Sequence, residues 1–142
     1  MANLTITAAD VRPLTGAKTR KAVCNEAMTV GDAVYIDGSS GNLPTVKMTL
    51  CAVLATGNLW GIVVAGDPAK EGSTAIAVGD TVDVCVYGPV TGFSGATAGA
   101  FTWGSDTAGK VADTVGTKST IAGVMETPTT LFVRPVQALR SI

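Results

Sequence analysis

Hydrophobic and polar residues alternate most regularly in the stretch 77–93. Its valines from Val82 to Val86 fall on one face, and more polar residues fall between them. A period of two is typical of a half-buried β-strand. Gly79-Asp80 precedes the alternation and Gly88-Pro89 follows it, and both pairs favour turns. The sequence therefore predicts a central strand that starts and ends at these turns.

Several other segments show a weaker form of the same pattern, while residues 59–65 form a continuous apolar run that is typical of a strand buried on both faces. Gly, Pro, Asn and Asp separate these segments. The segments predict strands at 3–7, 33–36, 43–46, 59–65, 100–103, 110–112, 121–126 and 130–133. Residues 47–58 fit either a short helix or an irregular loop. We therefore expect an all-β fold, a small antiparallel β-barrel, a β-tulip or a sandwich, with at most one short helix.

Two parts of the chain resemble each other. Residues 29–66 and 98–126 each read as a hairpin followed by a buried strand that begins with Gly and Ile or Val. The likeness rests mostly on glycine and valine, so it predicts a weak internal duplication within a single β domain that covers residues 22–142.

The first part of the chain, residues 1–21, has no sustained periodicity and is interrupted by Pro13 and Gly16. It carries four of the ten cations of the chain, whereas residues 22–109 carry eight carboxylates and two lysines. We interpret this segment as an extended N-terminal arm that binds a partner, the alternative being a first strand of the barrel itself. Its predicted partner-binding residues are Leu4, Ile6, Arg12, Lys18, Arg20 and Lys21.

Composition adds two expectations. Charged residues make up 15% of the chain. Such a low share fits equally well with a surface covered by a partner or by sister subunits and with a bland Thr/Ser/Gly surface. The start of the chain lacks the charged and apolar regions of a signal peptide, and no stretch is long and apolar enough to cross a bilayer. We expect synthesis in the cytoplasm and no membrane partner.

The inventory of reactive side chains argues against an enzyme. The chain has no histidine, which removes the commonest general base, and its three cysteines lack the paired spacing of a zinc site. Asp37-Gly38-Ser39 and Asp106-Thr107-Ala108-Gly109 only faintly resemble aspartic-protease loops and fit turns better. We expect no catalytic residue, metal, cofactor or small-molecule substrate. Cations without interleaved aromatics also argue against nucleic acid.

Two further motifs leave binding functions open. Val46-Lys47-Met48 resembles the modified hairpin tip of biotin-carrier domains, with Val in place of the first Met. Trp60 and Trp103 suit either core packing or a platform on which sugars stack. A carbohydrate- or receptor-binding module and a biotin-carrier-like domain therefore remain as alternatives.

Five motifs together resemble one known family, over roughly residues 10–135. They are GDAVYID at 31–37, GIVVAG at 61–66, VGDTVDVCVYGPVTGF at 78–93, AGKVAD at 108–113 and IAGVMET at 121–127. These motifs resemble the head decoration (capsid cement) proteins of tailed bacteriophages. The resemblance implies a homotrimer on the outer capsid surface of the virion, which stabilises the shell by bridging subunits of the major capsid protein. The family has no catalytic residues to carry over.

Overall fold

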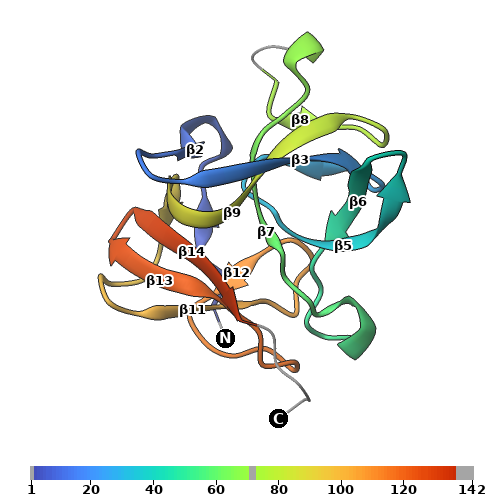
Figure 1. The fold of residues 1–142 in the computed structure, drawn as a ribbon. Coiled ribbons are helices and arrows are strands. Elements are labelled where there is room, and N and C mark those ends of the chain that lie inside the picture. The colour runs from blue at the N-terminus through green and yellow to red at the C-terminus, as the bar shows by residue number, and fades with distance from the viewer. Residues whose placement is uncertain (1, 71–72, 137–142) are drawn as a thin grey trace.

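A closed barrel of five strands forms one half of the fold. The computed structural model describes residues 2–70 and 73–136, and these contain no α-helix. Around the barrel the strands follow the order β3, β6, β5, β7 and β9, after which β9 pairs back with β3 (Figure 1). Their bounds are β3 Lys18–Cys24, β5 Ala33–Ser40, β6 Leu43–Met48, β7 Gly61–Ala65 and β9 Thr81–Thr91.

A second sheet extends from the far end of β9. It continues in the order β14, β13, β11 and β12, so that β9 belongs to both halves of the molecule. These strands are β11 Phe101–Gly104, β12 Val111–Ala112, β13 Ile121–Thr127 and β14 Thr130–Val136. The remaining elements are β1 Thr5–Ile6, β2 Arg12–Pro13, β4 Met28–Thr29, β8 Ala75–Ile76, β10 Phe93–Ser94 and three 3-10 turns at Ala8–Asp10, Leu54–Thr56 and Pro68–Lys70.

The all-β prediction is confirmed, and the barrel is mixed where an antiparallel one was expected. The exception is the pair β3–β6, which is parallel at Val23–Thr45 and Cys24–Val46. Two other strands, β4 and β5, lie between β3 and β6 in the sequence. Turn signals therefore could not reveal the direction in which β3 and β6 pair. Residues 47–58 form the end of β6 and a loop with one 3-10 turn.

The central strand is longer than predicted. Gly88-Pro89 does not end it, because β9 continues to Thr91 and pairs there with β14 on one side and β2 on the other. Gly88 has a φ of +118°, and a side chain at this position would meet the backbone of Ala17. A glycine is thus required where the strand turns from the barrel into the second sheet.

The core is built mainly from valines and other small apolar residues, in agreement with the composition. Two glycines allow strands to approach closely within it. A Cβ at Gly61 would collide with the carbonyl oxygen of Cys85, and one at Gly123 would collide with that of Phe132. Both glycines open or lie within the Gly-Ile/Val strands of the two similar segments. In these segments the pairing is also the same, since β5 pairs with β6 and β7, and β11 with β12 and β13.

The N-terminal segment is not an extended arm in this structure. Residues 2–21 lie against the same domain: β1 pairs with β10, and β2 and β3 pair with β9. Leu4 and Val11 are 4% and 7% exposed, and both belong to the core. The predicted strand at 3–7 therefore pairs with the domain itself as β1, and the burial of Leu4 and Val11 favours this docking.

Candidate partner-binding surface

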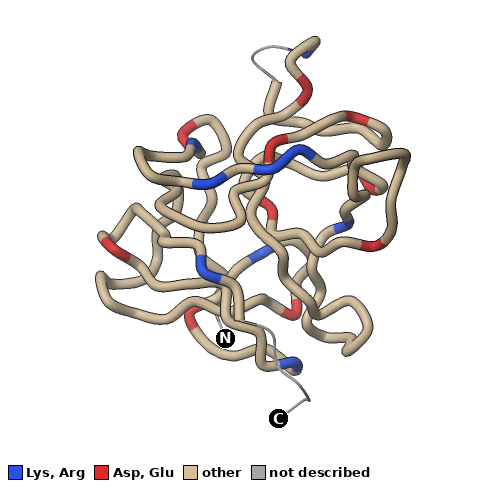
Figure 2. Tube along the Cα trace, viewed as in Figure 1, with Lys and Arg blue, Asp and Glu red and all other residues tan. Residues whose placement is uncertain are grey.

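Four of the predicted partner-binding residues lie together on one edge of β9. Residues 12–24 run antiparallel along this strand, first as β2 and then as β3. Their cations gather beside β2 and along β3 (Figure 2). All four are exposed. We call this set the cationic edge: Arg12, Lys18, Arg20 and Lys21.

The charge of the cationic edge is largely uncompensated. Lys21 forms an ion pair with Asp83 at 2.7 Å, and both side chains are well exposed, so the pair contributes less than about 1 kcal/mol to stability. Among the described residues, Arg12, Lys18 and Arg20 have no carboxylate within ion-pair distance. Three positive charges are thus free to interact with an acidic partner.

The other two predicted residues are placed differently. Leu4 is buried in the core, so it is not exposed to a partner. Ile6 is half-buried, and its side chain packs over Gly31. Their apolar character serves the docking of β1 on the domain, while the four cations point to solvent.

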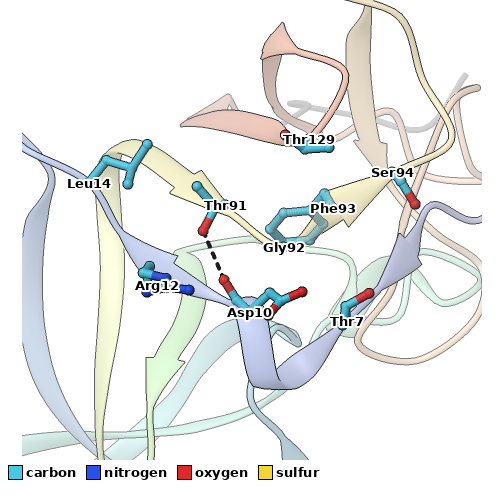
Figure 3. A pocket seen from close by; sticks show the side chains of 9 residues that line it. All are labelled: Thr7, Asp10, Arg12, Leu14, Thr91, Gly92, Phe93, Ser94 and Thr129. Atoms are coloured by element: carbon cyan, nitrogen blue, oxygen red, sulfur yellow. Dashed lines mark hydrogen bonds between the residues drawn. The ribbon is translucent and has the colours of Figure 1, made fainter.

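An open pocket lies at the Arg12 end of the cationic edge. It has a volume of about 540 Å³, and its walls come from the N-terminal segment, the end of β9, β10 and Thr129. Figure 3 shows Thr7, Asp10 and Arg12 along one rim and the ring of Phe93 between this rim and Thr129. The Thr91 hydroxyl donates to the Asp10 carbonyl oxygen at 2.8 Å and ties the rim to β9. The pocket has a polar rim and an apolar floor, which suits an inserted side chain.

A second feature adjoins the cationic edge. On the outer side of the second sheet, Phe101 pairs with Val124, Val124 with Phe132, and Phe132 with Pro89. Directly opposed residues of neighbouring strands share a face, so these side chains form one row. Tyr87 extends the row, with its ring centroid 5.0 Å from that of Phe132 and the planes at 85°.

A parallel row follows from the same pairing, with Trp103 opposite Ile121 and Ile121 opposite Val136. Phe101 is 57% exposed, Val136 50% and Tyr87 45%. Four of the seven aromatic residues of the chain thus lie on one outer surface. We call this set the aromatic face: Tyr87, Pro89, Phe101, Trp103, Ile121, Val124, Phe132 and Val136.

The aromatic face meets the cationic edge at one cross-strand pair. Lys18 on β3 lies opposite Tyr87 on β9, so the two sets form a continuous surface. Sequence reasoning missed the aromatic face, because its rows join strands that are distant in the chain. A signal was present, since Phe101 and Trp103 flank the buried Thr102, and Phe132 lies between the buried Leu131 and Val133. An outward aromatic in such an alternation indicates a binding surface.

The carboxylates that sequence motifs offered for catalysis have structural partners. Asp37 accepts hydrogen bonds from Asn25 and Thr45, and Asp106 accepts two from Thr117. Each therefore closes its own loop, which differs from the shared carboxylate site of an aspartic protease. Lys47 lies within β6 opposite Tyr35, so it does not occupy the hairpin tip that a biotin carrier requires.

Two buried carboxylates hold the turns that precede barrel strands. Asp80 binds Lys70 Nζ at 2.9 Å and accepts from the backbone N–H of Ala77, and the hydrogen bond from Lys70 lowers the pKa of Asp80. Asp32 accepts from the Thr29 N–H at 2.9 Å, and its burial raises its pKa. These are the two Gly-Asp turns of the sequence. Their carboxylates stabilise these turns through local hydrogen bonds.

The cysteines are also structural. All three are buried, and burial raises the pKa of Cys24 to about 12 and also raises that of Cys51 and Cys85. Such thiols are poor nucleophiles. Within residues 2–70 and 73–136, no group of three or more Cys, Asp and Glu side chains is arranged to hold a metal ion.

Comparison of the chain with known protein families, with curated proteins and with solved structures finds no match. In the described part of the chain, no helix has the length and apolar character that a membrane crossing needs. The features of the chain that bear on its function are thus the aromatic face, the cationic edge and the motifs in the sequence.

Proposed function

We propose that this protein is a structural capsid decoration protein, which binds the outside of a phage head and bridges subunits of the major capsid protein. The observation that carries the proposal is the continuous surface formed by the aromatic face and the cationic edge. Two of the five motifs that resemble the family lie in β9 and β13, which contribute to this surface, and the other three lie in β5, β7 and β12. In this proposal the protein is made in the host cytoplasm and acts on the virion surface as a homotrimer.

The chemistry of the surface fits a protein partner. Aromatic and arginine side chains contribute most of the binding energy at protein interfaces, and this surface offers both. Exposed apolar groups that adjoin one another in two rows lose contact with water when a partner covers them. Uncompensated cations beside them steer an acidic partner and orient it. Many such modest contacts, repeated over a shell, give strong overall attachment.

The test is binding to expanded shells of the major capsid protein encoded in the same genome, measured by co-sedimentation. Phe101→Ala and Tyr87→Ala should each weaken binding, with about a 30-fold effect if the residue is a hot spot. Val78→Ala is the matched control, because Val78 is 64% exposed and lies outside both sets. If the wild type binds shells and a double variant with Phe101→Ala and Tyr87→Ala binds them equally well, the assignment of this surface is refuted.

The trimeric state requires its own measurement. Sedimentation equilibrium at several concentrations, together with imaging of shell-bound protein, should show three copies in contact. A protein that stays monomeric in solution and on the shell would contradict the trimer and leave the decoration role to be judged by shell binding.

A second candidate function follows from the same aromatic rings. Aromatic side chains beside polar groups also form platforms on which sugars stack, and this surface presents the exposed Tyr87 and the half-buried Trp103. A carbohydrate- or receptor-binding module on a virion would bind particular glycans on an array and lose them on Tyr87→Ala or Trp103→Ala. Shell binding without glycan binding excludes this alternative.

A further inference from the structure

The barrel has an open strand edge at β3. This strand pairs with β9 from Lys18 to Val23, but it pairs with β6 only at Val23 and Cys24. Over residues 18–22, no strand in the described part of the chain covers the edge of β3 that faces away from β9. A stretch of backbone is therefore left without a neighbour beside the cationic edge.

Hydrogen bonds at the end of β3 show which backbone groups face outward. The N–H of Cys24 donates to Asp80 O at 2.9 Å, on the β9 side, while the N–H of Asn25 donates to Val46 O at 2.9 Å, on the β6 side. Successive residues of a strand direct their backbone groups to opposite neighbours. Counting back from Cys24, the N–H and C=O groups of Lys21 and Thr19 face away from β9 and point to the open edge.

The side chains around these groups select what can pair with them. Lys18 and Arg20 have no ion-pair partner among the described residues, and both are exposed. Edge cations usually protect a strand from pairing with other chains, and here they oppose pairing with a second copy of β3, which carries the same charges. An acidic strand meets no such repulsion, because its carboxylates would lie opposite Lys18 and Arg20.

From this geometry we propose that β3 accepts an extended acidic segment of the capsid subunit as an additional strand. The inference rests on the proposed function and deepens it by naming the kind of segment that binds. Backbone bonds to Thr19 and Lys21 supply the register, and charge supplies the choice of partner.

The decisive variant is Thr19→Pro. Proline removes the outward N–H of residue 19 and leaves the ladder of β3 with β9 intact, because that N–H does not take part in it. Thr19→Val is the matched control, since it keeps the N–H and favours a strand. The melting temperatures of both variants show whether the fold is retained.

The probe is a short synthetic peptide in which Glu alternates with Thr and Val. We expect it to bind the wild type, to slow hydrogen exchange at the amides of Thr19 and Lys21, and to bind more weakly as salt increases. Thr19→Pro should weaken binding roughly tenfold, and Thr19→Val should leave it nearly unchanged. The same peptide with alternate backbone nitrogens methylated should not bind, and a peptide with Lys in place of Glu should not bind.

Three results would overturn the inference. In the first, the methylated peptide binds as tightly as the unmethylated one. In the second, a folded Thr19→Pro variant binds the acidic peptide as tightly as the wild type does. In the third, a single-stranded oligonucleotide binds the same edge more tightly than the acidic peptide. The shell assay keeps the two proposals apart. If Thr19→Pro binds shells as the wild type does, strand addition is wrong and decoration stands. If the wild type binds the peptide but no shell, decoration is wrong and the strand-accepting edge stands.

Discussion

Leu4→Ala tests whether the N-terminal segment belongs to the core or acts as an arm. Leu4 is 4% exposed, and its backbone N–H donates to the Val111 carbonyl oxygen at 2.8 Å. Its side chain also lies beside Gly95, in the loop that precedes β11. The substitution removes three carbon atoms from this buried site and leaves the backbone bond in place.

The expected cost follows from burial. Replacing a buried leucine by alanine destabilises a protein by about 2–5 kcal/mol, because apolar contacts are lost and a cavity remains. Leu4 lies at the margin of the core on an edge strand, where the structure can relax, so we take a value of about 3 kcal/mol. In a domain of this size each kcal/mol lowers the melting temperature by roughly 3 °C, which gives a decrease of about 9 °C.

Thermal melting followed by far-UV circular dichroism, together with urea unfolding, measures this effect. Thr5→Ala is the control, since Thr5 is exposed on the same strand and should change stability by less than about 0.5 kcal/mol. A surface substitution of this kind changes the melting temperature by at most about 2 °C. If Leu4→Ala melts within that range of the wild type and loses shell binding, the core assignment is refuted. Residues 1–21 would then act as the arm that the sequence suggested.

Three further predictions concern stability and thiol chemistry. The hydrogen bond from Lys70 lowers the pKa of Asp80 below the 3.8 of a free aspartate. The ionised Asp80 therefore stabilises the folded state above pH 3.8, and this contribution is lost as the pH falls through the folded-state pKa. Asp80→Asn should flatten the decline, below about pH 4, of the free energy of unfolding measured in urea. Gly123→Ala would press a Cβ against the Phe132 carbonyl oxygen and should cost about 3 kcal/mol or more in urea unfolding. The thiol of Cys24, whose pKa burial raises to about 12, should not react with a disulfide reagent at mild pH until the protein unfolds.

Each of these has a clear contrary result. An acid decline unchanged by Asp80→Asn would show that other carboxylates control it. Gly38→Ala, with a φ outside the left-handed region and only the Thr45 hydroxyl near the new Cβ, is the mild control for Gly123→Ala. Equal stability of the two glycine variants would contradict the close approach of β13 and β14. Rapid thiol reaction in the folded state would contradict the burial of Cys24.

The accuracy of the strand predictions followed the burial of each strand. The segment that became β9 shows valines at a period of two, and the segment that became β7 shows the continuous apolar run of a strand buried on both faces. The strand β3 was missed because its first four residues are exposed and three of them carry charge, while only Ala22 and Cys24 are buried. An edge strand needs few apolar residues, so its sequence resembles a loop.

Position within a strand decided the other differences. Gly88-Pro89 predicted the end of the central strand and the last strand was predicted to end at residue 133, yet β9 continues to Thr91 and β14 continues through Pro135 to Val136. Glycine accommodates the bend of β9 at Gly88, where a side chain would meet the backbone of Ala17. Local turn chemistry cannot show this, since it depends on which strand lies alongside.

The sequence alone determined the all-β class, the central strand, the absence of histidine chemistry and the concentration of cations before residue 22. These properties are local, and each can be stated from composition or from a period of two. The tertiary structure alone decided the closure of the barrel through β3 and β6, the docking of Leu4 and Val11, and the joining of Phe101, Phe132 and Tyr87 into one face. These depend on register between distant strands, and a shift of one residue would turn every side chain to the opposite face.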